Sequence, residues 1–126
     1  MVTGMRLVLD TDPNIHLVHR YGAGAIEVGA QRLVRPFIIT PERLILDWQA
    51  SSFEQLAAAH LEALFALAAP VVLLGAGERQ SFPSAAVRAS FRARGIALEC
   101  MTLGAACRTY NILATEGRRV AAGLFP

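Results

Sequence analysis

The densest group of polar side chains in the sequence is the run Cys107-Arg108-Thr109-Tyr110-Asn111. An arginine can hold an anion with its planar fork of N–H donors, and an asparagine can both donate to and accept from a ligand. At about 100° per residue, Cys107, Arg108 and Asn111 fall on one helical face, which predicts a polar surface for an anionic ligand or a partner. In the alternative interpretation, the same side chains cap and pin neighbouring loops.

A second group is Gly75-Ala76-Gly77, which follows the apolar run Val71–Leu74. Open α/β sheets bind ligands where their strands end, and glycines let backbone N–H groups approach a phosphate or carboxylate. The dinucleotide fingerprint is absent because Gln80 stands where its third glycine would fall, and a chain without lysine has no Walker phosphate loop. The alternative is a glycine turn that lets the strand end tightly.

The remaining reactive side chains predict no catalytic set. A nucleophilic Cys107 would need a histidine base, and His16, His19 and His60 are all distant in sequence. His16 and His19 are three residues apart in an expected strand and therefore point to opposite faces, whereas His60 falls on an apolar helical face. Two cysteines without suitably spaced further ligands make neither a disulfide framework nor a zinc site. We expect no metal and no cofactor.

The elements that would position these residues change character near position 51. Before it, short apolar runs separated by turn residues predict an antiparallel β-rich half. The expected strands are Met5–Leu9, Ile15–Tyr21, Ala25–Val28, Val34–Ile39 and Leu44–Trp48, with Asp10 and Asp12 in a turn.

After position 51 the pattern alternates strands and helices. Ser51-Ser52-Phe53-Glu54 fits a capping box that would start a helix ending before Pro70. The expected elements that follow are a strand at Val71–Leu74, a helix from Pro83 to Arg94, a strand at Ile96–Met101, a helix between Thr102 and Glu116, and a strand at Val120–Leu124. This order predicts parallel strands with right-handed crossovers. The fold class is therefore α/β: one domain, residues 1–126, with a mixed central sheet, a βαβαβ C-terminal half and an antiparallel N-terminal half.

Composition narrows the functional classes. Of the 126 residues, 54% are hydrophobic and 17% are charged. Soluble domains usually contain about 25% charged residues. The net charge of +2 comes from arginines scattered along the chain, which argues against nucleic-acid binding. A surface poor in charge favours a protein partner or a homo-oligomer that covers apolar area.

The sequence resembles the Mth-like domain family, a domain of unknown function. The resemblance rests on Gly75–Gly77, Pro83, Met101-Thr102, the run from Ala106 to Asn111, and Glu116-Gly117-Arg118, with Tyr21-Gly22, Gly24 and Trp48 also in place. That family includes a mitochondrial respiratory complex I assembly factor and the adipogenesis-associated Mth-like domain protein. The resemblance implies an α/β domain with a mixed sheet and no agreed catalytic residues. The positions carried over as a candidate ligand or partner surface are Gly75, Gly77, Arg108, Thr109, Tyr110 and Asn111.

Two functional hypotheses follow. The first is a non-enzymatic interaction or assembly-factor-like module, with respiratory complex I as one candidate assembly. The second is a small anionic-ligand-binding protein or enzyme with a site between the Gly75–Gly77 loop and the helix bearing Arg108 and Asn111. The chain begins almost directly with the domain and shows no signal or mitochondrial presequence, so we expect a bacterial cytoplasmic protein. The longest apolar run is broken by Pro70, which argues against a membrane span.

Overall fold

The computed structural model describes residues 4–6 and 14–126, and its centre is a five-stranded sheet. The strand order is β6 (Leu44–Ile45), β5 (Phe37–Ile39), β9 (Val120–Phe125), β7 (Val71–Ala76) and β8 (Ala97–Met101). β7 pairs in parallel with both β8 and β9, whereas β5 runs antiparallel to β9. Every residue of β9 is buried, as expected of a strand covered on both faces. The predicted mixed sheet and βαβαβ half are confirmed.

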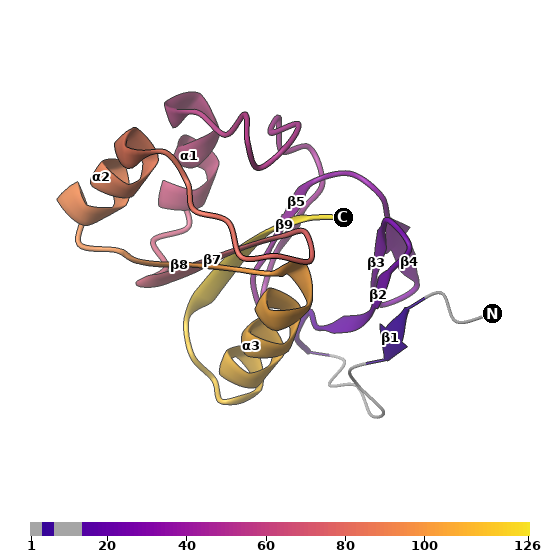
Figure 1. The fold of residues 1–126 in the computed structure, drawn as a ribbon. Coiled ribbons are helices and arrows are strands. Elements are labelled where there is room, and N and C mark those ends of the chain that lie inside the picture. Colours follow the sequence, from indigo (N-terminus) through magenta and orange to yellow (C-terminus); the bar gives the residue numbers. More distant parts are fainter. Residues whose placement is uncertain (1–3, 7–13) are drawn as a thin grey trace.

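Helices cover both faces of this sheet (Figure 1). α1 (Ala58–Phe65) and α2 (Ala85–Ala93) lie on one face, and α3 (Leu103–Thr115) lies on the other. The hydroxyls of Ser84 and Thr102 accept from Val87 N and Ala105 N, so both side chains cap the helices that follow them. Thr102 stands at the predicted start of the last helix, and the structure makes it the N-cap.

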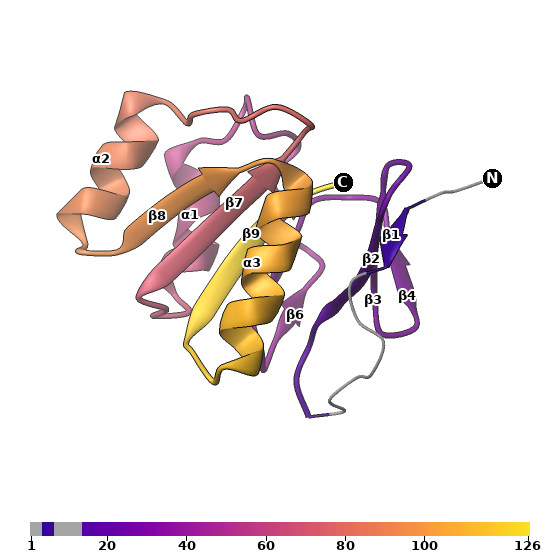
Figure 2. The same ribbon diagram turned by 60° about the horizontal axis from the view of Figure 1, so that its bottom comes forward.

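A second sheet lies on the far side of α3 (Figure 2). It contains β1 (Met5–Arg6), β2 (Val18–Gly22), β3 (Ala25–Val28) and β4 (Gln31–Leu33), all antiparallel. Residues of β2 and β3 share one hydrophobic cluster with α3 and with the central sheet. The N-terminal half therefore divides: β1–β4 form a separate layer over α3, while β5 and β6 extend the central sheet.

The helix expected to start near Ser51 begins later than predicted. The Ser52 hydroxyl accepts from Gln55 N and closes only a local turn, and α1 begins at Ala58. Phe53, which belongs to the predicted capping pattern, packs edge-on against Phe125 with ring centroids 5.9 Å apart. This contact with the end of β9 keeps residues 51–57 out of the helix. The predicted start of the helix is therefore wrong.

Several expected strands are shorter than predicted, and residues next to β5 and β6 account for two of the differences. β5 starts at Phe37, directly after Pro36, which has no N–H to donate. β6 ends at Ile45, and Trp48 beyond it is buried with its indole N–H donating to the carbonyl of His60 at 2.9 Å. β4 was missed, and β2 begins three residues later than expected. The rest of the first expected strand, and the turn with Asp10 and Asp12, lie outside the described residues.

Among residues 4–6 and 14–126, none of the helices has both the length and the apolar character that a membrane span requires.

Candidate functional site

A cavity of about 420 Å³ opens where β7, β8 and β9 end. Its walls come from the β2–β3 turn, the loop after β7, the first turns of α3 and the C-terminal end of the chain. The lining residues are Tyr21, Gly22, Ala23, Gly24, Gly77, Glu78, Thr102, Leu103, Gly104, Arg108, Phe125 and Pro126. Ligands of open α/β sheets commonly bind at this end of parallel strands.

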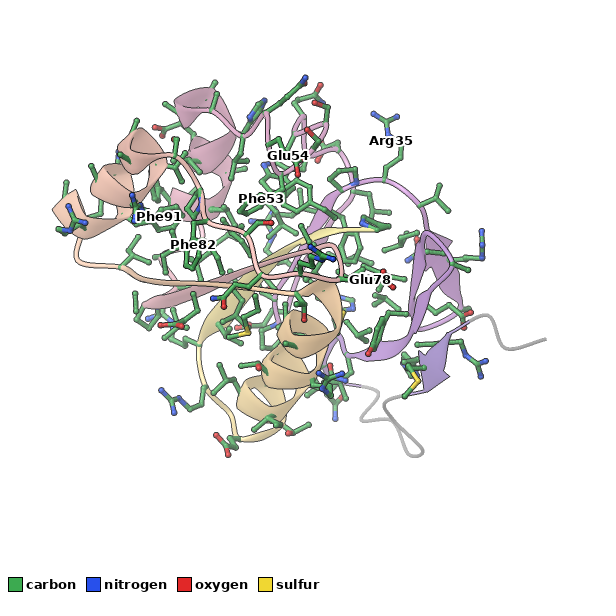
Figure 3. All side chains as sticks on the ribbon, viewed as in Figure 1. Arg35, Phe53, Glu54, Glu78, Phe82 and Phe91 are labelled. Atoms are coloured by element: carbon green, nitrogen blue, oxygen red, sulfur yellow. The ribbon has the colours of Figure 1, made fainter. Side chains whose placement is uncertain are left out.

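Arg108 supplies the positive charge in this cavity. Its guanidinium donates to the Tyr21 hydroxyl at 2.9 Å, and no described carboxylate lies within the 4.0 Å of an ion pair. The remaining N–H donors of the exposed Arg108 fork are therefore available to an anion. Glu78, on the loop after β7 (Figure 3), lines the same cavity and gives it a wall of opposite charge.

The two glycines of the predicted loop have different structural roles. Gly75 is buried on β7, and a Cβ atom there would collide with the Cβ of Ala106 on α3. It therefore allows close contact between sheet and helix and does not reach the cavity. Gly77 has φ of +69° and lines the cavity, and its carbonyl accepts from Leu103 N at 2.9 Å.

Asn111 and Tyr110, from the same polar run on α3, form hydrogen bonds with the backbone of residues in or just before the second sheet. Asn111 Oδ1 accepts from Val18 N at 2.9 Å, and Asn111 Nδ2 donates to Val18 O at 2.8 Å. Tyr110 is fully buried, and its hydroxyl donates to the carbonyl of His16 at 2.7 Å. Thr109 is half-buried and does not line the cavity. Among the predicted surface residues, only Gly77 and Arg108 line the cavity.

Cys107 and Asn111 therefore do not lie on an open polar surface, and the contacts of Asn111 fit the alternative in which these side chains pin neighbouring segments. Both side chains face the packed side of the helix, because α3 is covered by a sheet on each side. Cys107 is fully buried, and this burial raises the pKa of its thiol from 9.0 to about 12, although nearby Arg108 opposes the shift. A thiol that stays protonated at neutral pH is a poor nucleophile.

The other thiol, Cys100, and His60 do not line this cavity. Cys100 is half-buried, and its pKa is raised to about 11, chiefly by desolvation and also by Glu99. His60 is half-buried, as expected, and its Nδ1 accepts from Ala57 N at 2.9 Å to cap α1. No three His, Cys, Asp or Glu side chains in residues 4–6 and 14–126 lie close enough together to hold a metal ion.

Most lining residues were not among the predicted site residues, and two of these, Tyr21 and Gly104, lie against each other. A Cβ on Gly104 would lie 2.5 Å from the Tyr21 hydroxyl oxygen, so a glycine lets the ring lie across the start of α3. Glycine is unfavourable inside a helix, and its presence in the first turn was the available signal of a close approach.

Comparison with known proteins places the chain in a family. The family model described as "Protein of unknown function (DUF498/DUF598)" matches residues 18–125. Among curated proteins, the Danio rerio "NADH dehydrogenase [ubiquinone] 1 alpha subcomplex assembly factor 3" is 31% identical over 87% of this chain. The match spans 64% of that relative, so the chain covers under two thirds of its length. Proteins of the same name from Bos taurus and Homo sapiens also match.

Solved structures agree with the fold. A protein from Xanthomonas campestris is 43% identical, with a TM-score of 0.81 over 93% of this chain and 90% of that one. A Bordetella pertussis protein described as a Mth938-like domain is 29% identical, with a TM-score of 0.79 over 97% of this chain and 92% of that one. The resemblance drawn from the sequence is confirmed.

Proposed function

The chain belongs to the DUF498/DUF598 family and has the fold of a Mth938-like domain, and from this premise we propose that it is a non-enzymatic assembly module. It would bind protein components of a multi-subunit complex, with respiratory complex I the leading candidate, in the bacterial cytoplasm. All 126 residues would act as one domain.

The observation that carries this proposal is the similarity to curated complex I assembly factors over most of the chain. The chemistry of the described residues is consistent with a role in binding. The more accessible thiol, Cys100, has a raised pKa, and Cys107 is buried. Large apolar side chains of the described residues are exposed on separate segments: Met5, Val34, Leu46, Phe82 and Ile112.

Affinity capture of the tagged chain from its own cells, followed by quantitative mass spectrometry, tests the proposal. We expect enrichment of complex I subunits or of proteins that assemble them. The matched control is an equally expressed chain with destabilised packing, Gly75→Leu, which adds a large side chain where Ala106 already fills the space. Enrichment that is equal for the folded and misfolded chains, or that lacks respiratory components altogether, would contradict the proposal.

A second candidate function is the binding of a small anion in the cavity at the strand ends. The observation that favours it is Arg108, an exposed guanidinium that lines the cavity without an ion-pair partner among the described residues. A carboxylate or phosphate could accept from this fork and from the Tyr21 hydroxyl together.

Thermal unfolding in the presence of a panel of anionic metabolites tests this second candidate. We expect a concentration-dependent rise in Tm for at least one anion, and loss of the rise in Arg108→Ala. The control with an equal change of charge is Arg32→Ala, at an exposed position on β4 that does not line the cavity. A rise in Tm that persists in Arg108→Ala would place the anion elsewhere.

A further inference from the structure

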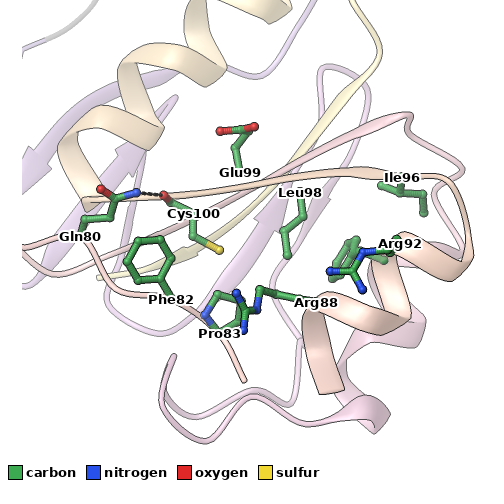
Figure 4. A pocket seen from close by; sticks show the side chains of 10 residues that line it. Gln80, Phe82, Pro83, Arg88, Arg92, Ile96, Leu98, Glu99 and Cys100 are labelled. Atoms are coloured by element: carbon green, nitrogen blue, oxygen red, sulfur yellow. Dashed lines mark hydrogen bonds between the residues drawn. The ribbon is translucent and has the colours of Figure 1, made fainter. Parts of the chain in front are cut away.

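A groove of about 380 Å³ runs along the free edge of the central sheet, between β8 and α2 (Figure 4). Its apolar part is built from Phe82, Phe91, Ile96 and Leu98, and Phe82 is 70% exposed. An apolar groove beside an unpaired strand has the two features that recognise an extended peptide: pockets for side chains and backbone groups for hydrogen bonds.

The outer edge of β8 is available for such hydrogen bonds. Ala97 N donates to Pro70 O at 3.0 Å, on the side of β8 that faces β7. Because the backbone groups of successive residues in a strand point to alternate sides, the N–H and C=O groups of Leu98 and Cys100 point away from β7. The Cys100 carbonyl is covered by the side-chain amide of Gln80 at 3.1 Å. Gln80 is exposed, and among the described residues it is the one side chain that satisfies this edge. A peptide strand could replace it.

The charges beside the groove select the partner. Arg88 and Arg92 are four residues apart on α2, so they lie on one side of the helix, and both line the groove. No described carboxylate forms an ion pair with either arginine. Glu99 also lines the groove, but its carboxylate projects from the opposite face of β8 (Figure 4). The α2 side of the groove is therefore positively charged.

This charge argues against a second copy of the chain as the occupant. An antiparallel pair of β8 strands in full register would place Glu99 opposite the Glu99 of the other copy, where like charges are destabilising. Both α2 helices would then lie on the same face of the continued sheet, so the Arg88 and Arg92 side chains of the two copies would meet across the junction. A partner segment with an acidic side chain near Arg88 and Arg92 would avoid both the Glu99 pair and the arginine pair.

We infer that the edge of β8 binds an extended segment of another protein, which adds a strand to the sheet and carries an acidic side chain toward Arg88 and Arg92. An apolar side chain of the segment would fill the space beside Phe82. Because side chains on one face of a strand repeat every second residue, about 6.6 Å apart, an even number of positions separates the acidic residue from the apolar one. This inference rests on the proposed function, since it names the surface through which the module holds a partner.

The test uses the purified full chain and a displayed library of random linear peptides. Enriched peptides are synthesised with a fluorophore, and their Kd is measured by anisotropy for the chain and for an Arg88→Ala, Arg92→Ala variant. We expect enriched peptides with an acidic residue an even number of positions from an apolar one. We expect affinity about tenfold weaker for the variant, because charge-assisted hydrogen bonds are lost. An Arg32→Ala, Arg35→Ala variant, with equal charge change on exposed positions remote from β8, should bind as the unaltered chain does.

N-methylation of successive peptide amides identifies strand addition directly. We expect binding to be lost when alternate amides are methylated and kept for those between them, because only every second N–H faces β8. Uniform tolerance of methylation, the absence of acidic residues from the enriched peptides, or equal affinity of the Arg88→Ala, Arg92→Ala variant would overturn the inference. Sedimentation showing a peptide-free dimer with slowed hydrogen exchange at Leu98 and Cys100 would also overturn it and assign the edge to a second copy.

Failure of this inference is distinguishable from failure of the proposed function. If the captured respiratory proteins are retained by the Arg88→Ala, Arg92→Ala variant, the assembly role stands and this surface is excluded. If peptides bind as described but no respiratory protein is captured, the edge binds segments of a different assembly.

Discussion

The side-chain amide of Asn111 forms hydrogen bonds with both backbone groups of Val18, 93 residues earlier in the chain. The amide offers one acceptor and one donor in the same arrangement as the backbone of an adjacent strand. It thereby fastens the second sheet to α3, and α3 in turn sets one wall of the cavity that contains Arg108.

Asn111→Ala should lower the free energy of unfolding by about 2–3 kcal/mol, because it removes the hydrogen bonds that Asn111 makes with the N–H and C=O of the buried Val18. Denaturant unfolding measures the change. Ile112→Ala, on the neighbouring exposed position, should change stability by less than about 0.5 kcal/mol. Equal effects of the two substitutions would mean that the amide does not fasten the sheet.

Gly75→Ala should destabilise the protein by about 1–3 kcal/mol through overpacking against Ala106. The double variant with Ala106→Gly restores the space but loses about 1 kcal/mol of helix propensity. It should therefore be more stable than the sum of the two single changes predicts. Additive effects in this double-mutant cycle would show that the two positions do not compete for space.

Stability should fall as the pH rises above about 9, the ordinary pKa of a thiol. Burial raises the pKa of the Cys107 thiol from 9.0 to about 12 and also raises that of Tyr110, so the folded chain keeps protons that the unfolded chain releases. Each group then contributes a slope of about −1.4 kcal/mol per pH unit between its unfolded and folded pKa. Urea unfolding at a series of alkaline pH values measures this dependence.

The Cys107→Ala variant isolates the contribution of the thiol. It should show a shallower loss of stability than the unaltered chain as the pH rises from 9.0 toward 12. A variant with the same pH dependence as the parent would mean that Cys107 ionises as readily in the folded protein as in the unfolded one.

The C-terminal half was predictable because its local signals agree with its tertiary contacts. Thr102 caps α3, and the fully apolar run that begins at Val71 is a strand buried in the sheet. The segment after Ser51 was not predictable, since the capping pattern there competes with a long-range aromatic contact between Phe53 and Phe125. The spacing of apolar residues along the sequence does not reveal such a contact.

The candidate site was predictable only in part for the same reason. The helix pattern predicted one polar face for α3, but a second sheet covers the side on which Cys107 and Asn111 lie. Only the fold reveals that layer, because β2 and β3 are distant from α3 in sequence. Arg108 remains on the open side and lines the cavity, together with Tyr21 from the same second sheet.

Assistance in the assembly of a respiratory complex is tested most directly by deletion of the coding sequence. Native gel electrophoresis of the membranes then measures the amount of assembled complex I, and NADH oxidation measures its activity. We expect less assembled complex, with accumulated partial assemblies, and recovery when the intact chain is supplied again. Unchanged amounts of assembled, active complex I in the deletion strain would contradict the proposed function.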